Sequence, residues 1–258
     1  MDLETFDWLL TDDGQALLVQ AAALVGDGRS PLAVGSALRR TTTGERAAAA
    51  LTQVELRERA VAKFGDRAHR MYFTPDGLEQ STRLPVAQHR AGRYTAFEAR
   101  SLIDLGCGIG GDLVAAAQAG VVCAGVDLDP IRVAIAEANL AALGLAGAVR
   151  VADATEVDHT AFDLAFADPA RRTGAGRSFR VEDWNPPWPW VQSLLERDAC
   201  VKVAPGIPHR LIPSGVEAEW VSDTGEVKEA ALWAGRTATT ARRATVIPAS
   251  GGLASLTD

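Results

Sequence analysis

Cysteine is scarce in this chain of 258 residues, which has three, and no two of them form a C-x-x-C pair. Cys107, Cys123 and Cys200 each lie in or beside an apolar stretch, so we expect reduced thiols in the core and not metal ligands. The four histidines also lack metal-ligand spacing, and no serine stands at a nucleophile elbow. These absences argue against a metal site and against a hydrolase.

Long hydrophobic runs are missing as well. No apolar stretch approaches the roughly 18 residues that a membrane-spanning helix needs. The first ten residues, MDLETFDWLL, are acidic where a secretory signal would be basic. Hydrophobic residues make up 47% of the chain and charged residues 23%, which is the balance of an ordinary globular protein. We therefore expect a cytoplasmic protein without a membrane partner.

Lysine is rare, with three copies, and the charge is distributed unevenly. The net charge of -7 at first argues against a nucleic-acid partner. However, residues 37–100 carry a net charge of +5, whereas residues 101–258 carry -7. Because alanine and arginine are abundant throughout the chain, single arginines are weak evidence for a polyanionic partner.

No β-strand pattern of any length precedes residue 100. The segment GQALLVQAAALV predicts a helix that Thr11 caps and that stops at Gly26, and apolar positions at helical spacing predict a longer helix over residues 44–64. Ser30 caps a shorter helix between them. The segment YFTPDG predicts a turn, and PVAQHRAGRY predicts a last helix. We therefore predict an all-helical N-terminal domain over residues 1–97.

Short apolar segments separated by helix-like segments begin at residue 101. The apolar segments are SLIDL, VVCAGV, AVRVA, FDLAFA, ACVKVA, VEAEWVS and RATVIP. Strands of this kind are typical of a parallel sheet that is covered on both faces. We predict a doubly wound, mostly parallel, Rossmann-like α/β domain with seven strands over residues 98–258. No Gly/Ser linker precedes it, so we expect the helical part to pack against it.

The first predicted strand runs into a glycine-rich loop. Asp104 ends the strand, and Gly106, Cys107, Gly108 and Gly110 follow it. Glycine permits a sharp turn from strand to helix and a close approach of a ligand to the backbone. The loop also spells G-x-G-x-x-G, which leaves a nicotinamide dehydrogenase as an alternative. A carboxylate just before the loop favours S-adenosylmethionine, because it suits an ammonium group and repels a pyrophosphate.

Two more strands end in carboxylates at the same predicted edge of the sheet. The second ends in GVDLDP, so Asp127, next to Leu128, lies where an acid accepts hydrogen bonds from ribose hydroxyls. The third ends in VADAT, so we expect Asp153, next to Ala154, to face the adenine amino group. The alternative is that each acid caps the following helix, and this alternative applies most to Asp153.

Asp168 and Pro169 directly follow the fourth strand. Together with D-x-G-x-G-x-G and the GVDLDP and VADA acids, they make residues 101–205 resemble class I S-adenosylmethionine-dependent methyltransferases. More narrowly, MYFTPDGLEQSTRLPVAQHRAGRY and DPARR resemble bacterial methyltransferases with a THUMP-like domain, distant relatives of trimethylguanosine synthases. Those relatives usually carry a small C-terminal domain suspected of RNA contact, which we expect to be absent because the sequence ends at Asp258.

The resemblance implies that Asp168 and the carbonyl of Pro169 hold an exocyclic base amine toward the methyl group of the cofactor. Related amine methyltransferases continue with a second proline and an aromatic residue that stacks on the base. This chain departs from them with Ala170 and Arg171. Stacking would therefore have to come from another part of the chain.

Aromatic residues shortly after this motif are candidates for stacking on a base, namely Phe179, Trp184 and Trp188. The segment N-P-P-W that begins at Asn185 matches the amine methyltransferase motif better than Asp168 and its successors do. No apolar strand precedes that segment, so we interpret it as the lead into the next helix.

Arginines after the fourth strand suit a phosphate-bearing substrate, and a solvated surface loop is an equally good explanation. They are Arg171, Arg172, Arg177 and Arg180, to which the helical part would add Arg83, Arg90 and Arg93. We also expect Thr82 to approach the methionine carboxylate of the cofactor, as polar groups at that place do in the families that this chain resembles. The alternative for Thr82 is a helix N-cap.

These observations predict an S-adenosylmethionine-dependent methyltransferase that acts on an exocyclic base amine in RNA, with Trp184 among the substrate-binding residues. A small-molecule methyltransferase is an alternative, favoured by the acidity of residues 101–258. A cofactor-binding module without catalysis is another, favoured by the incomplete motif after Asp168. Salt dependence of RNA binding separates the first two.

Overall fold

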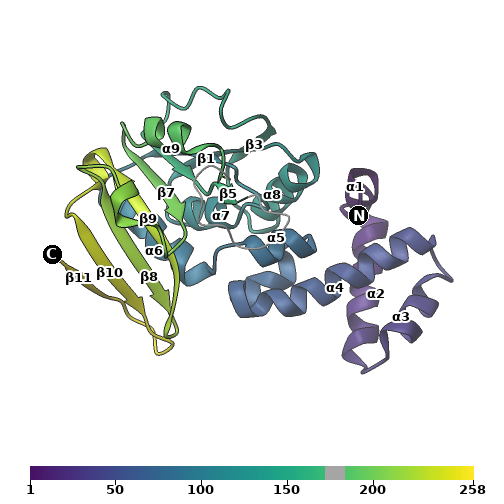
Figure 1. The fold of residues 1–258 in the computed structure, drawn as a ribbon. Helices are drawn as coiled ribbons and strands as arrows, with labels where there is room; N and C mark the ends of the chain where they lie inside the picture. The colour runs from purple at the N-terminus through teal and green to yellow at the C-terminus, as the bar shows by residue number, and fades with distance from the viewer. Residues whose placement is uncertain (172–183) are drawn as a thin grey trace.

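The computed structural model describes residues 1–171 and 184–258, with helices alone in the first part of the chain and strands together with further helices in the second (Figure 1). The α-helices are α1 (Leu3–Leu9), α2 (Asp12–Gly26), α3 (Pro31–Leu38), α4 (Gly44–Phe64), α5 (Pro75–Gln80), α6 (Leu84–Ala96), α7 (Gly111–Gln118), α8 (Pro130–Ala142) and α9 (Trp188–Leu194). The strands are β1 (Ser101–Leu105), β2 (Val122–Asp127), β3 (Ala148–Val151), β4 (Leu164–Ala167), β5 (Ala170–Arg171), β6 (Trp184–Asn185), β7 (Ala199–Val203), β8 (Glu217–Asp223), β9 (Glu226–Ala234), β10 (Arg242–Ile247) and β11 (Ala254–Thr257).

Nine strands form one mixed sheet in the order β11-β10-β8-β9-β7-β4-β1-β2-β3. The neighbours of β1, β2 and β4 are all parallel, whereas β9 runs antiparallel to both β7 and β8. All seven predicted strands are present, but the predicted count is wrong because β9 and β11 were missed. The sequence of β9, EVKEAALWA, is rich in helix-forming residues, and its burial between two strands overrides that preference.

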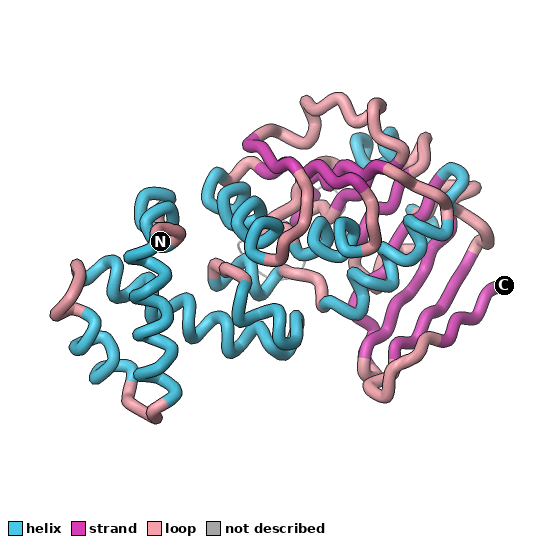
Figure 2. Tube along the Cα trace, turned by 180° about the vertical axis from the view of Figure 1, so that it is seen from behind, coloured by secondary structure: helices cyan, strands magenta, loops and turns pink. Residues whose placement is uncertain are grey.

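The helical region begins as the sequence predicts. Thr11 and Ser30 accept hydrogen bonds from backbone N–H groups in the first turns of α2 and α3, which confirms both caps. The turn predicted at YFTPDG is wrong in its second half, because α5 begins at Pro75 with Thr74 as its cap. Figure 1 and Figure 2 show α1 to α3 gathered at one end of the molecule, α4 running from them toward the sheet, and the antiparallel strands at the other end.

The helical region and the sheet region share a hydrophobic core. Ile109 and Ile135, which belong to the α/β part, are buried in the same cluster as Phe6, Phe64 and Phe73. This confirms that the helical part packs against the α/β part. The domain boundary at residue 97 stays a prediction.

Helices cover both faces of the sheet, as predicted. Helices α6 and α7 pack on one face through residues such as Tyr94 and Leu113, and α9 packs on the other through Val191 and Leu194. All three cysteines are buried and unpaired, as expected. In the part of the chain that the structure describes, every helix is too short or too polar to cross a membrane.

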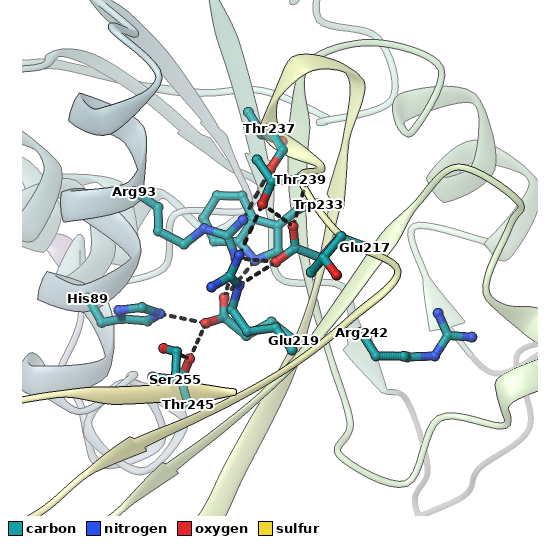
Figure 3. A network of polar contacts seen from close by, with 12 residues as sticks. His89, Arg93, Glu217, Glu219, Trp233, Thr237, Thr239, Arg242, Thr245 and Ser255 are labelled. Atoms are coloured by element: carbon teal, nitrogen blue, oxygen red, sulfur yellow. Dashed lines mark hydrogen bonds and ion pairs between the residues drawn. The ribbon is translucent and has the colours of Figure 1, made fainter. Parts of the chain in front are cut away.

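A buried polar network attaches α6 to the sheet (Figure 3). Arg93 donates to Glu217 and Glu219 of β8, at 2.7 Å each, and its guanidinium lies 3.9 Å from the centre of the Trp233 ring. His89 contacts Glu219 at 2.7 Å. Because both glutamates are fully buried, each needs these partners. The network fixes the helix that leads into β1.

Candidate active site

An open cavity of about 900 Å³ lies at the carboxyl ends of the parallel strands, where ligands bind in doubly wound folds. The ends of β1, β2, β4 and β7, the segment after β3 and the segment that follows α5 all contribute to it. Of the predicted cofactor and catalytic residues, it is lined by Thr82, Asp104, Gly106, Cys107, Gly108, Asp127, Leu128, Asp153, Ala154, Asp168 and Pro169. The structure therefore brings the predicted site together, except for Gly110.

The glycine loop makes the sharp turn from strand to helix that its sequence predicts, and three of its glycines have a left-handed backbone. Gly106, Gly108 and Gly110 have φ angles of 105°, 56° and 81°. At the first two, an added Cβ would meet no atom within 4 Å, so the backbone there is open to a ligand. A Cβ on Gly110 would lie 3.1 Å from the Cβ of Ala136. Gly110 therefore serves the packing of α7 on α8 and does not line the cavity.

Asp104 at the end of β1 is the most unusual group of the site. Its side chain is 1% exposed, and its Oδ1 has no hydrogen-bond partner in the described residues. Burial raises the pKa of Asp104 well above its usual range, and the neighbouring carboxylates Asp112 and Asp168 raise it further. A buried acceptor without a partner is costly, and an ammonium group in the cavity would satisfy it.

The carboxylate of Asp127 is held in place from two sides. Its Oδ2 accepts from the N–H of Gly108 at 2.9 Å, and its Oδ1 accepts from the N–H of Asp129 at 3.0 Å. The next residue, Leu128, is 55% exposed and lines the cavity. This arrangement suits a nucleoside, because the fixed carboxylate of Asp127 can accept from ribose hydroxyls while the exposed apolar side chain of Leu128 contacts the base.

Asp153 does not cap a helix, so the alternative interpretation is wrong. Its Oδ1 accepts from the N–H and the hydroxyl of Thr155 at 2.8 and 2.7 Å, in a turn that no helix follows. The hydroxyl and the N–H of Thr155 lower the pKa of Asp153. An ionised acceptor therefore stands at the edge of the cavity, next to Ala154.

A chain of charged contacts that the sequence analysis missed lies behind Asp168. Lys202 of β7 donates to Asp168 Oδ2 at 2.5 Å and to Thr82 Oγ1 at 3.3 Å. The hydroxyl of Thr82 donates to Asp112 at 3.0 Å, and Asp112 forms an ion pair with the buried Arg90. Thr82 is therefore no N-cap, and Arg83 occupies the cap position of α6. The sequence signal that could have indicated these contacts is the lysine inside the otherwise apolar strand ACVKVA.

Segments far apart in the sequence meet beside Pro169. Trp184 lines the cavity, is 8% exposed and packs edge-on against Trp188, with ring centres 5.2 Å apart. Asn185 and Pro186 also line the cavity, because β6 pairs with β5 directly after Pro169. The segment leads into α9, as interpreted, and the two-residue strand β6 brings it to the cavity wall.

The arginines of α6 do not form the expected cationic surface. Arg90 is 2% exposed and paired with Asp112 and Glu229, and Arg93 is paired with two buried glutamates. Buried and neutralised guanidinium groups do not bind phosphate, so this expectation is wrong for both. Arg83 is half-buried beside Asp223. Arg171 lies in β5, and Arg172, Arg177, Phe179 and Arg180 lie outside the described residues.

The described lining of the cavity is acidic. Three cationic side chains, Arg132, Lys202 and Lys228, face seven carboxylates. The carboxylates are Glu79, Asp104, Asp112, Asp127, Asp129, Asp153 and Asp168. They do not gather into a metal site, since no cluster of three or more His, Cys, Asp or Glu ligands occurs in residues 1–171 and 184–258. A cationic ligand is favoured, and a pyrophosphate is disfavoured.

Comparison with known proteins agrees with this geometry. Residues 103–169 match the family model of a methyltransferase domain, and residues 2–60 match a domain of unknown function. Two curated proteins, from the CDC 1551 and H37Rv strains of Mycobacterium tuberculosis, are each described as an uncharacterized S-adenosylmethionine-dependent methyltransferase. Each is 37% identical over 204 residues, which cover 75% of this chain and 56% of the relative. The chain thus spans about half the length of these relatives.

A solved structure supports the fold. A candidate methyltransferase from Porphyromonas gingivalis W83 superimposes with a TM-score of 0.71 and 22% identity, covering 94% of this chain and 65% of that one. Such a likeness shows the fold alone. The matched family model shows that this chain contains a methyltransferase domain, and the strand ends of that domain line the cavity.

Proposed function

We propose that this protein transfers a methyl group from S-adenosylmethionine to an exocyclic amine of an RNA base. The observation that carries the cofactor part is the buried Oδ1 of Asp104, which has no hydrogen-bond partner among the described residues, in a residue that lines the cavity beside the glycine loop. The ammonium of the cofactor would satisfy this atom, and the fixed carboxylate of Asp127 would accept from the ribose. When bound, the cofactor supplies an electrophilic methyl group on a sulfonium.

Asp168 is the residue that would orient the amine. Lys202 occupies its Oδ2, which leaves Oδ1 to accept a hydrogen bond from the amine, while the carbonyl of Pro169 takes the second amine hydrogen. Two acceptors turn the nitrogen lone pair toward the methyl group. Transfer would form the nitrogen–carbon bond and break the carbon–sulfur bond, leaving S-adenosylhomocysteine, and the surplus amine proton would pass to Oδ1 of Asp168 and on to solvent. The indole of Trp184, beside Pro169 in the cavity wall, would contact the base.

RNA as the substrate class, and the narrower relationship to methyltransferases with a THUMP-like domain, rest on the sequence resemblance. The acidic lining of the cavity favours a second candidate, a small neutral or cationic acceptor. The burial of Arg90 and Arg93 favours this candidate as well, because it removes two cations from the expected phosphate surface.

Transfer of tritium from labelled S-adenosylmethionine to fractionated RNA and to a small-molecule extract tests the function. We expect label in the RNA fraction, and we expect Asp168→Asn to lose transfer while still binding S-adenosylhomocysteine. The matched control is Asp198→Asn, which removes a carboxylate that is paired with Arg236 outside the cavity. Label only in the small-molecule extract would refute the RNA assignment, and cofactor binding without any transfer would indicate a non-catalytic module.

A further inference from the structure

Lys202 and Asp104 lie on the same face of the sheet. Asp104 of β1 pairs in register with Phe166 of β4, which pairs with Cys200 of β7, and Lys202 follows two residues later. Side chains that pair in register, or that lie two residues apart in a strand, share a face. One strand separates β1 from β7, so the two backbones lie roughly 10 Å apart. Both side chains line the same cavity.

The ammonium of Lys202 has capacity for one more acceptor. It carries three N–H donors, and among the described residues it uses one on Asp168 and one on Thr82. Its side chain is 17% exposed, so the group is largely withdrawn from solvent while it still reaches the cavity. Burial acts to lower the pKa of Lys202, but Asp168 and other nearby carboxylates outweigh it and raise that pKa. The group therefore remains a cation.

Thr82 is less suited to bind an anion than the sequence predicts. Its hydroxyl hydrogen is directed at Asp112, and its oxygen accepts from Lys202. A hydroxyl whose only hydrogen is already donated cannot donate to an incoming carboxylate. The anion-binding role expected for Thr82 would therefore fall to Lys202, which donates to the same hydroxyl.

The amino-acid end of the cofactor presents an ammonium and a carboxylate on the same carbon. We propose that Lys202 binds this α-carboxylate while Asp104 binds the ammonium, an inference that rests on the proposed cofactor site. The other two cations of the cavity are placed less well for this task. Arg132 lies next to its partner Asp129, beyond Asp127 on the nucleoside side, and Lys228 is paired with Glu226 at the start of β9.

Calorimetric titration with matched ligands tests this assignment. The ligands are S-adenosylhomocysteine and its decarboxylated analogue, 5′-S-(3-aminopropyl)-5′-thioadenosine, which keeps the ammonium. For the wild type we expect the analogue to bind roughly 10- to 150-fold more weakly, the loss typical of one charged hydrogen bond. For Lys202→Met we expect S-adenosylhomocysteine to weaken by a similar factor, whereas the affinity for the analogue stays within about threefold. The control Arg236→Met, which removes a cation paired with Asp198 outside the cavity, should leave both affinities within about twofold.

The outcomes separate the inference from the proposed function. If the wild type binds both ligands equally, or if Lys202→Met weakens both by the same factor, Lys202 does not bind the carboxylate, although the cofactor site stands. If the wild type does not bind S-adenosylhomocysteine, the cofactor site itself is refuted, and this inference falls with it. The wild-type comparison needs no variant, so equal binding of the two ligands overturns the inference even if Lys202→Met does not fold.

Discussion

Replacing Asp104 by asparagine should have opposite effects on binding and on stability. The substitution keeps the shape of a side chain that is 1% exposed and removes its charge. A charged hydrogen bond to the ligand ammonium contributes roughly 1.5–3 kcal/mol, so the Kd for S-adenosylhomocysteine should rise roughly 10- to 150-fold. The ligand-free protein should not lose stability, because the Oδ1 that is altered has no partner to lose in the part of the chain that the structure describes.

The pH dependence follows from the raised pKa of Asp104. The folded protein keeps this proton at pH values where the unfolded chain has lost it, so the wild type loses stability as pH rises from about 3.8 toward the raised pKa. Asp104→Asn lacks this loss, and urea unfolding should show the difference growing with pH. Binding of an ammonium should also ionise Asp104, so titrations in buffers of different ionisation enthalpy should show release of up to about one proton in the wild type.

The control for Asp104→Asn is Glu79→Gln, which removes one charge from the exposed rim of the same cavity. It should change the affinity by less than about threefold, because an exposed charge is screened by solvent. Wild-type affinity and wild-type proton release in Asp104→Asn would refute the ammonium assignment. A loss of stability without a loss of affinity would show that Asp104 has a structural role only.

Two further predictions concern stability. Gly110→Ala should destabilise the fold by about 2–3 kcal/mol in urea unfolding, because left-handed backbone strain adds to a 3.1 Å contact with Ala136. Gly108→Ala should show the backbone strain alone, about 1 kcal/mol. Equal losses in the two variants would contradict the packing role of Gly110. Burial acts to raise the pKa of Glu219, but His89 and Arg93 outweigh it and lower that pKa to about 2. The wild type should therefore lose about 3 kcal/mol of its free energy of unfolding as pH falls from 4.5 to 2. Glu219→Gln should show a flatter dependence of this free energy on pH. The same acid dependence in both proteins would exclude Glu219 as its source.

The sequence predicts the parallel half of the sheet well, because the apolar pattern of each segment there matches its place in the sheet. Strands such as SLIDL are continuous apolar runs that are buried on both faces, and they end in the acids that line the cavity. Antiparallel β9 was missed because its composition favours a helix and only its neighbours make it a strand. The fold outside the parallel core therefore depends on tertiary contacts that spacing does not encode.

The pairing of charged residues was the other feature that the sequence did not predict. Arg90 and Arg93 look like surface cations in a helix, but both pair with glutamates that lie more than 100 residues later in the sequence, on β8 and β9, and Arg90 also pairs with Asp112. Lys202 likewise reaches Asp168 and Thr82 only because β7 lies beside β4. A motif is local and can be read from the sequence, whereas the partner of a charge is set by strand order.

The distribution of unsatisfied atoms separates the structural part of this charge system from the ligand-binding part. Glu217 and Glu219 are fully buried, and each has at least three polar partners, so they need no ligand. Among the described residues, four buried side-chain polar atoms lack a partner, and two of them belong to Asp104 and Trp184 in the cavity wall. An unpaired buried polar atom costs roughly 1–3 kcal/mol. The fold pairs the buried carboxylates of Glu217 and Glu219 fully, but it leaves Asp104 without a partner among the described residues. Asp104 lies at the end of β1, where a ligand ammonium can enter the cavity.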